Sequence, residues 1–192
     1  MSVQQEFYYS ILIVSSSDKF SESVKRHLKG FRTIDIRKSS ALARRCILER
    51  YYDIIVINAP LKDESGIEFA FDVTDKCNSS VLFVSPIEVY DDVLENTTDR
   101  GILSISKDMV DTRLGVAISY LSAVQGRFKR LEKKTLSLEE KIKEIRLVNK
   151  AKALLIEKKD MSEDEAHRYI GKLAMDNGVS RGRIAEDIID EY

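Results

Sequence analysis

Residues 53–58 read DIIVIN and decide the fold of the N-terminal part of the chain. Four consecutive aliphatic residues, all β-branched, are typical of a strand buried on both faces of a parallel sheet. Comparable runs occur at 9–14 (YSILIV), 80–85 (SVLFVS) and 101–106 (GILSIS), with a weaker one at 33–37. Stretches with helical apolar spacing separate them. This alternation predicts an α/β domain over residues 1–120, with a flavodoxin-like (βα)5 architecture.

From Val110 to Ile145 the heptad positions recur at alternating spacings of four and three residues without a slip, and all but the polar Thr135 are apolar. Such alternation is the heptad pattern of a left-handed coiled coil. An amphipathic helix packed on its own domain gives the same spacing, but this helix is too long for a five-stranded sheet to cover. We therefore expect a coiled-coil helix over residues 110–145 that forms a homodimer. The dimerisation residues that we predict are Leu121, Val124, Phe128, Leu131, Leu138, Ile142 and Ile145.

Residues 145–192 break the heptad register and predict a compact unit of three helices. The first helix continues through Ala151 to Lys159. Ser162 precedes Glu165 by three residues, which is the spacing of a capping box at the start of a second helix. Asn177–Gly178 predicts a helix stop, and Ser180 is placed to cap a third helix.

Composition excludes several classes of function. The formal net charge is −1, and it divides into −3 for residues 1–120 (15 basic, 18 acidic) and +2 for residues 121–192 (16 basic, 14 acidic). This mild asymmetry does not by itself identify a nucleic-acid ligand. With two cysteines and two histidines, no zinc site of familiar spacing can be assembled. We expect no cofactor and no enzymatic activity, because no phosphate-binding glycine loop, nucleophile–base pair or metal cluster is present.

The expected compartment is the cytoplasm. No apolar run approaches the roughly 20 residues that span a bilayer, and the polar segment Met1–Phe7 does not read as a signal peptide.

Residues 8–120 resemble the receiver domain of bacterial response regulators. The resemblance rests on ILIV in the first strand, DIIVIN in the third, Ser85 at the end of the fourth and Lys107 after the fifth. Receivers that are phosphorylated need an aspartate at the end of the third strand, and an acidic pair after the first strand to hold Mg²⁺. This sequence has Asn58 at the first of these positions, and Ser15 and Ser16 at the second.

The phosphorylation site is therefore degenerate, and no other acid replaces it. Asp18 lies within the first helix, Asp53 starts its strand, and Asp63 falls in a loop. Without a phosphoacceptor, Ser85 and Lys107 become ordinary polar residues at strand ends. We interpret residues 1–120 as a pseudo-receiver that does not signal by aspartyl phosphorylation and that contacts a regulatory protein or senses another signal.

The segment VNKAKALLIEKKDMSEDEAHRYIGKLAMDNGVSRGRIAEDII resembles the ANTAR domain of transcription antitermination regulators. Ala151–Lys152, Met161–Ser162–Glu163, Leu173–Ala174–Met175 and Ile184–Ala185 fall in the family's register, whereas Ala153 replaces the usual glycine. The resemblance implies an ANTAR domain over residues 145–192 that binds hairpin loops of nascent RNA. The candidate RNA-binding residues are Lys150, Ala151, Lys152, Arg168, Lys172, Met175, Arg181 and Arg183.

Three alternatives qualify this interpretation. Tyr169 is placed to stack on a base, but a core aromatic residue at helical spacing is the simpler role. The basic residues alternate with acids, a pattern also typical of a solvated surface. Residues 178–184 resemble part of a helix-turn-helix, although the acids that follow oppose insertion into a DNA groove. A DNA-binding regulator is thus the second hypothesis, and a coiled-coil scaffold without a nucleic-acid ligand is the third.

Overall fold

The computed structural model describes residues 8–192, which divide into two compact units on either side of the boundary between Lys129 and Arg130. The expectation about Met1–Phe7 lies outside the described residues. None of the helices formed by residues 8–192 has an apolar stretch that could cross a bilayer.

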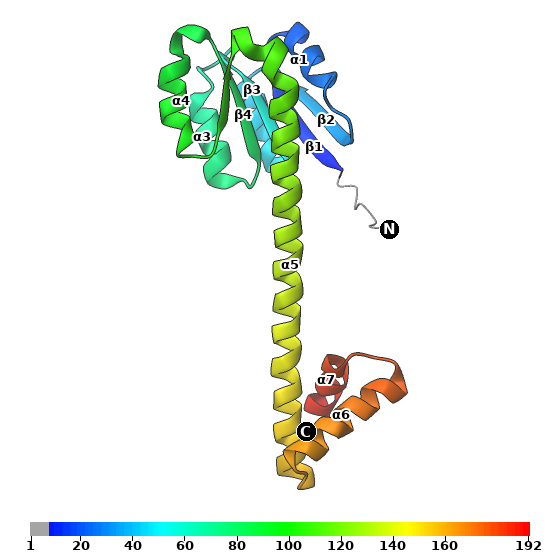
Figure 1. Cartoon of the computed structure of the whole chain (residues 1–192). Helices are drawn as coiled ribbons and strands as arrows, with labels where there is room; N and C mark the ends of the chain where they lie inside the picture. Colours follow the sequence, from blue (N-terminus) through cyan, green and yellow to red (C-terminus); the bar gives the residue numbers. More distant parts are fainter. Residues whose placement is uncertain (1–7) are drawn as a thin grey trace. The chain divides into compact units, whose positions relative to one another are not determined.

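The first unit is built on a five-stranded parallel sheet with the strand order β2-β1-β3-β4-β5 (Figure 1). The strands are β1 (Tyr9–Val14), β2 (Phe31–Arg37), β3 (Ile54–Asn58), β4 (Ser80–Ser85) and β5 (Leu103–Ser106). All four neighbouring pairs run parallel. Every residue of β3 is buried, as its uninterrupted apolar run predicts for a central strand. The flavodoxin-like (βα)5 fold is therefore confirmed.

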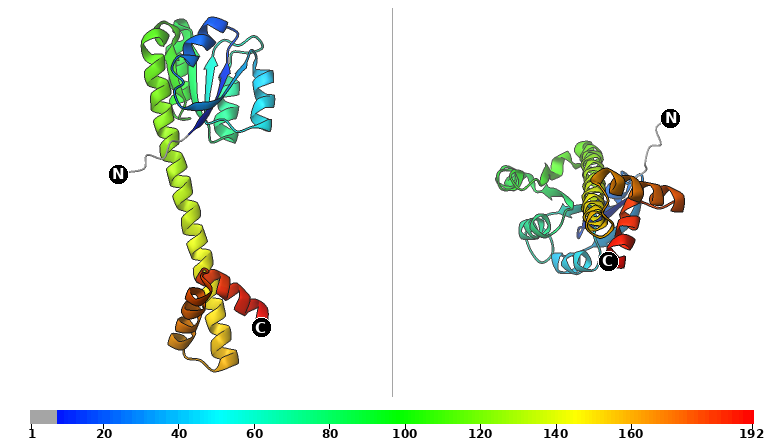
Figure 2. Two further views of the ribbon diagram at one scale, coloured as in Figure 1. Left: turned by 90° about the vertical axis from the view of Figure 1, so that its right-hand side faces the viewer. Right: turned by 90° about the horizontal axis from the view of Figure 1, so that it is seen from below.

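Helices cover both faces of this sheet (Figure 2). Helices α2 (Ser40–Glu49) and α3 (Ile67–Lys76) pack on one face, and α1 (Asp18–Lys25) and the first turns of α5 (Val110–Lys159) pack on the other. Helix α4 (Tyr90–Thr98) precedes the edge strand β5. Short 3-10 turns, Ile87–Val89 and Lys107–Met109, lead into α4 and α5.

Helix α5 is a single helix of 50 residues. Within the first unit it contributes Leu114, Ala117, Ile118 and Leu121 to the core beneath the sheet. Leu121 is 4% exposed. The prediction that Leu121 contributes to a dimer is therefore wrong, because this side chain fills the core of its own domain. The start of α5 is therefore an amphipathic helix packed on its own domain, which was the alternative to a coiled coil.

Two polar side chains extend this attachment of α5 to the sheet. Gln125 is 3% exposed, and its Nε2 donates to the Asn78 carbonyl and to Ser80 Oγ, each at 3.0 Å. Lys129 Nζ lies 2.7 Å from Asp53 Oδ1 and 5.1 Å from the centre of the Tyr9 ring. Asp53 thus serves a structural role at the start of β3.

The second unit consists of the end of α5, α6 (Glu163–Asn177) and α7 (Arg181–Glu191) (Figure 2). Both reciprocal hydrogen bonds of the predicted capping box are present between Ser162 and Glu165. Gly178 ends α6 with a left-handed backbone at φ 64°, and Ser180 caps α7. The core of the unit contains Ala151, Leu155, Ala166, Ile170, Ala174, Ile184, Ala185 and Ile188.

Candidate functional site

At the end of β3, where the resemblance to receivers predicts the phosphoacceptor position, the Asn58 amide takes part in a hydrogen-bond network. Asn58 Nδ2 donates to Ser15 Oγ at 2.9 Å. The same hydroxyl accepts from the Ser17 backbone N–H at 3.0 Å and donates to the Ser17 carbonyl at 3.3 Å. Ser15 is fully buried, whereas Ser16 is exposed. These groups are neutral, so they lack the charge that holds Mg²⁺ beside an aspartyl phosphate.

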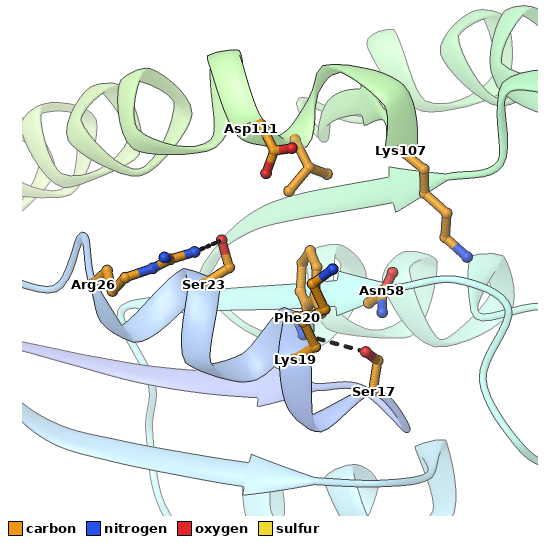
Figure 3. A pocket seen from close by; sticks show the side chains of 9 residues that line it. Ser17, Lys19, Phe20, Ser23, Arg26, Asn58, Lys107 and Asp111 are labelled. Atoms are coloured by element: carbon orange, nitrogen blue, oxygen red, sulfur yellow. Dashed lines mark hydrogen bonds between the residues drawn. The ribbon is translucent and has the colours of Figure 1, made fainter.

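Ser85 and Lys107 occupy different environments near this network. Ser85 is completely buried, and its Oγ has no hydrogen-bond partner among the described residues. Lys107 is exposed and shares a pocket of about 320 Å³ with Asn58 (Figure 3). The pocket brings Asn58 and Lys107 together; Ser15, Ser16 and Ser85 do not line it.

The other acids near this end of the sheet have structural roles of their own. The Asp63 carboxylate accepts hydrogen bonds from the Ala41 and Ser40 backbone N–H groups and from Ser40 Oγ, at 2.9 to 3.0 Å. These donors, the Ala41 amide foremost, lower the pKa of Asp63 to about 2. Asp18 forms an exposed ion pair with Lys38 at 3.0 Å. Residues 8–192 contain no cluster of three or more side chains suited to holding a metal ion.

In the helical unit, Lys152 is the most restrained of the candidate RNA-binding cations. Its side chain is 15% exposed, and its Nζ lies 2.9 Å from Glu163 Oε1 at the start of α6. The hydrogen bond from Lys152 lowers the pKa of Glu163 below its usual value. A polyanion that binds Lys152 must therefore either displace the Glu163 carboxylate or bind Lys152 alongside it.

Lys152 and Arg181 line one pocket of about 370 Å³ in the helical unit. The guanidinium of Arg181 lies over α6, since a Cβ added to Gly171 would be 3.8 Å from Arg181 Nε and Nη2. The pocket is also lined by residues that were not predicted from the sequence: Lys141, Glu144, Val148, Asn149 and His167. Of these, Asn149 is detectable as a polar residue in the heptad register, whereas His167 carries no spacing signal. The pocket thus combines basic and amide donors with two aliphatic side chains and one carboxylate, Glu144, which accepts from the Gly182 N–H at 3.1 Å.

The remaining candidates do not share this pocket. Ala151 is completely buried in the core, so the prediction that it contacts RNA is wrong. Its small side chain lets α5 pack against its neighbours. Lys150 is exposed outside the pocket. Arg183 pairs with Asp187 at 3.2 Å and Glu186 at 3.6 Å on α7.

A second surface of the helical unit runs along α6. Arg168, Lys172 and Met175 are exposed at spacings of four and three, which place them on one side of the helix, and Met175 is 80% exposed. Tyr169 packs against the core instead, with Lys159 Nζ 5.4 Å from its ring centre. It therefore occupies the position of a core aromatic residue.

The rest of the heptad positions on α5 form an exposed apolar stripe. Thr135 interrupts the stripe with a hydroxyl that donates to the Leu131 carbonyl. The exposed fractions are Val124 40%, Phe128 42%, Leu131 53%, Leu138 50%, Ile142 50% and Ile145 59%. Repeated half-exposed apolar residues at heptad spacing are characteristic of an unpaired coiled-coil surface.

Comparisons with known proteins found similarities to each of the two units. The chain is 24% identical over 139 residues to the transcriptional regulatory protein PdtaR of Mycobacterium tuberculosis, covering 72% of this chain and 67% of that protein. The signal receiver domain of an HD domain-containing protein from Pseudomonas fluorescens superposes with a TM-score of 0.56 at 16% identity, covering 68% of this chain and 98% of that one.

The response regulator domain of Thermotoga maritima CheB gives a TM-score of 0.54 at 14% identity, covering 62% of this chain and 98% of that domain. These structural similarities establish the receiver fold of the first unit. The ANTAR domain family matches residues 136–189. The chain therefore carries an ANTAR domain at residues 136–189, and its first unit has the receiver fold.

Proposed function

We propose that this protein is a homodimeric regulator that binds hairpin loops of nascent RNA through its ANTAR domain and prevents formation of a terminator. The observation that carries the proposal is the pocket that brings Lys152, Arg181 and His167 together in the helical unit. Ammonium, guanidinium and imidazole groups beside an amide are suited to phosphates and to the exposed base edges of an RNA loop. Nascent RNA as the ligand implies that the protein acts in the cytoplasm, as a regulator and not as an enzyme.

Dimerisation is the second part of the proposal. The stripe from Val124 to Ile145 is half-exposed in a single chain, and pairing two copies buries it. A dimer presents two ANTAR domains, so one RNA with two linked hairpins occupies both. The second contact is then intramolecular, at an effective concentration on the order of millimolar for a short flexible linker.

DNA binding is less well supported because of the charges on α7. Arg183 is already paired with Glu186 and Asp187 on the same helix. A helix inserted into a DNA groove would bring those carboxylates close to phosphates, which is unfavourable. The scaffold hypothesis predicts no salt-dependent binding to either polymer.

The test is a gel-shift titration of the full chain with a two-hairpin RNA and a duplex DNA at matched salt. We expect preference for the RNA, and Lys152→Ala should weaken binding by about tenfold, because a charge-assisted contact contributes about 1.5 kcal/mol or more. Lys133→Ala is the matched control, since Lys133 is exposed on the same helix outside the pocket. Equal affinity of Lys152→Ala and wild type, or preference for the DNA, would contradict the proposal.

A further inference from the structure

The pocket beside Asn58 has the charge of an anion site and not that of a metal site. It lies between α1 and the start of α5 at the carboxyl ends of the strands (Figure 3). Three basic side chains, Lys19, Arg26 and Lys107, line it together with one acid, Asp111. A phosphorylated receiver needs carboxylates here to hold a cation. With the basic side chains in excess, a cation is repelled and an anion is attracted.

The lysines of this pocket are available for a ligand. Neither Lys19 nor Lys107 has an ion-pair partner among the described residues, and both are exposed. Within residues 8–192, the Arg26 guanidinium is engaged only with Ser23 Oγ, through Nη2 at 3.1 Å. Ammonium and guanidinium groups without carboxylate partners are the donors that bind oxyanions through charge-assisted hydrogen bonds.

The hydrogen bonds of Ser15 fix which end of the Asn58 amide faces the pocket. A hydroxyl has one proton to donate and two lone pairs with which to accept. Ser15 Oγ gives its proton to the Ser17 carbonyl and accepts from the Ser17 N–H, so its remaining capacity is as an acceptor. Asn58 must therefore direct its Nδ2 toward Ser15, as observed at 2.9 Å. Its Oδ1, a hydrogen-bond acceptor, is left for the pocket. Asn58 itself is 8% exposed.

The ligand that satisfies these groups is an oxyanion that still carries a proton. Its unprotonated oxygens accept from the lysines, and its hydroxyl donates to Asn58 Oδ1. Inorganic phosphate keeps at least one proton near neutral pH. Sulfate has none, and a phosphomonoester with a pKa of about 6 is mostly unprotonated. We propose that this pocket binds inorganic hydrogen phosphate reversibly and without a metal ion, as a ligand site in place of the lost phosphorylation site.

The experiment is calorimetric titration of the full chain with sodium phosphate in the presence of a chelator, with sodium chloride keeping the ionic strength constant. We expect saturable binding at one site, with a Kd on the order of 1 mM or tighter. Sulfate and glycerol phosphate should bind about fivefold more weakly, because each lacks the proton for Asn58 Oδ1. Tighter binding of sulfate than of phosphate would overturn the proposed role of the amide.

Two substitutions of exposed residues test the pocket in opposite directions. Lys107→Gln should weaken phosphate binding by about fivefold or more, and Asp111→Asn should tighten it by about threefold, since each changes one charge beside the anion. Lys29→Gln, the same change on an exposed lysine that does not line the pocket, should leave the affinity unchanged. Unchanged thermal melting of the variants would show that they fold. Absence of saturable binding, or equal effects of Lys107→Gln and Lys29→Gln, would overturn the proposal whatever the outcome for RNA.

Discussion

Replacing Lys129 by methionine tests how firmly the sheet domain holds its part of α5. The Asp53 side chain is 4% exposed, and its Oδ1 lies 2.7 Å from Lys129 Nζ. Its Oδ2 accepts from the backbone N–H and the Oγ of Ser10 at 2.7 and 2.9 Å. Lys129→Met removes the only cation paired with this carboxylate among the described residues.

The expected cost follows from this geometry. Breaking a buried ion pair by removing one partner typically destabilises a protein by 3–5 kcal/mol, because a charge is left without compensation. Here the two bonds from Ser10 keep Oδ2 satisfied, and Lys129 is itself 26% exposed. We therefore expect the free energy of unfolding of the sheet domain to fall by about 2 to 3 kcal/mol. Adding Asp53→Asn to Lys129→Met should restore about 1 kcal/mol of the free energy of unfolding, since the unpaired charge of Asp53 is then removed.

The assay is hydrogen exchange at increasing urea, read peptide by peptide, so that β1 and β3 are followed separately from the helical unit. Lys133→Met serves as the control, because this exposed residue should change stability by no more than about 0.5 kcal/mol. If Lys129→Met lowered the free energy of unfolding of β1 and β3 no more than Lys133→Met does, the ion pair would not be holding α5 to the sheet.

Three further predictions address the helical unit, the loop after β3 and the stripe on α5. Leu155→Ala should destabilise the helical unit by about 2–5 kcal/mol in urea unfolding, because Leu155 is completely buried; a change under about 0.5 kcal/mol would contradict that packing. Asp63→Ala should cost about 1 kcal/mol by removing the acceptor of the Ser40 and Ala41 N–H groups at the start of α2. Because the pKa of Asp63 is lowered to about 2, its contribution is full above the ordinary value of 3.8 and disappears as the pH falls toward 2, so the variant and wild type should converge in acid denaturation. Ile142→Lys should convert the proposed dimer to a monomer in analytical ultracentrifugation by placing a charge in the apolar stripe; a dimer of unchanged stability would place the interface elsewhere.

The sequence predicted the structure best where consecutive residues are buried or where a feature depends on neighbouring residues alone. The run DIIVIN predicts a central strand because only a strand covered on both faces tolerates consecutive aliphatic residues, and β3 is buried throughout. The Ser162–Glu165 capping box and the Gly178 stop were equally predictable, because each depends on neighbouring residues alone. The interpretation of a degenerate phosphorylation site rests on the identity of Asn58 at the end of β3, and it stays a prediction.

Predictions that depend on partners distant in sequence were less successful. Leu121 fits the heptad register, but a helix packed on a sheet produces the same spacing, and only the fold assigns this side chain to the domain core. Ala151 belongs to a segment resembling a known domain, yet its burial follows from helices that meet it in space. The packing of three helices brings His167, Lys152 and Arg181 into one pocket. No spacing in the sequence predicts that arrangement.

The most direct test of the proposed function compares the affinity of the full chain for a two-hairpin RNA with its affinity for one hairpin alone, in wild type and in Ile142→Lys. Linked binding predicts that wild type prefers the two-hairpin RNA by about a hundredfold or more. The Ile142→Lys variant should lose that preference while binding a single hairpin as wild type does. Equal affinity of wild type for the two RNAs, or an undiminished preference in a monomeric variant, would contradict the account.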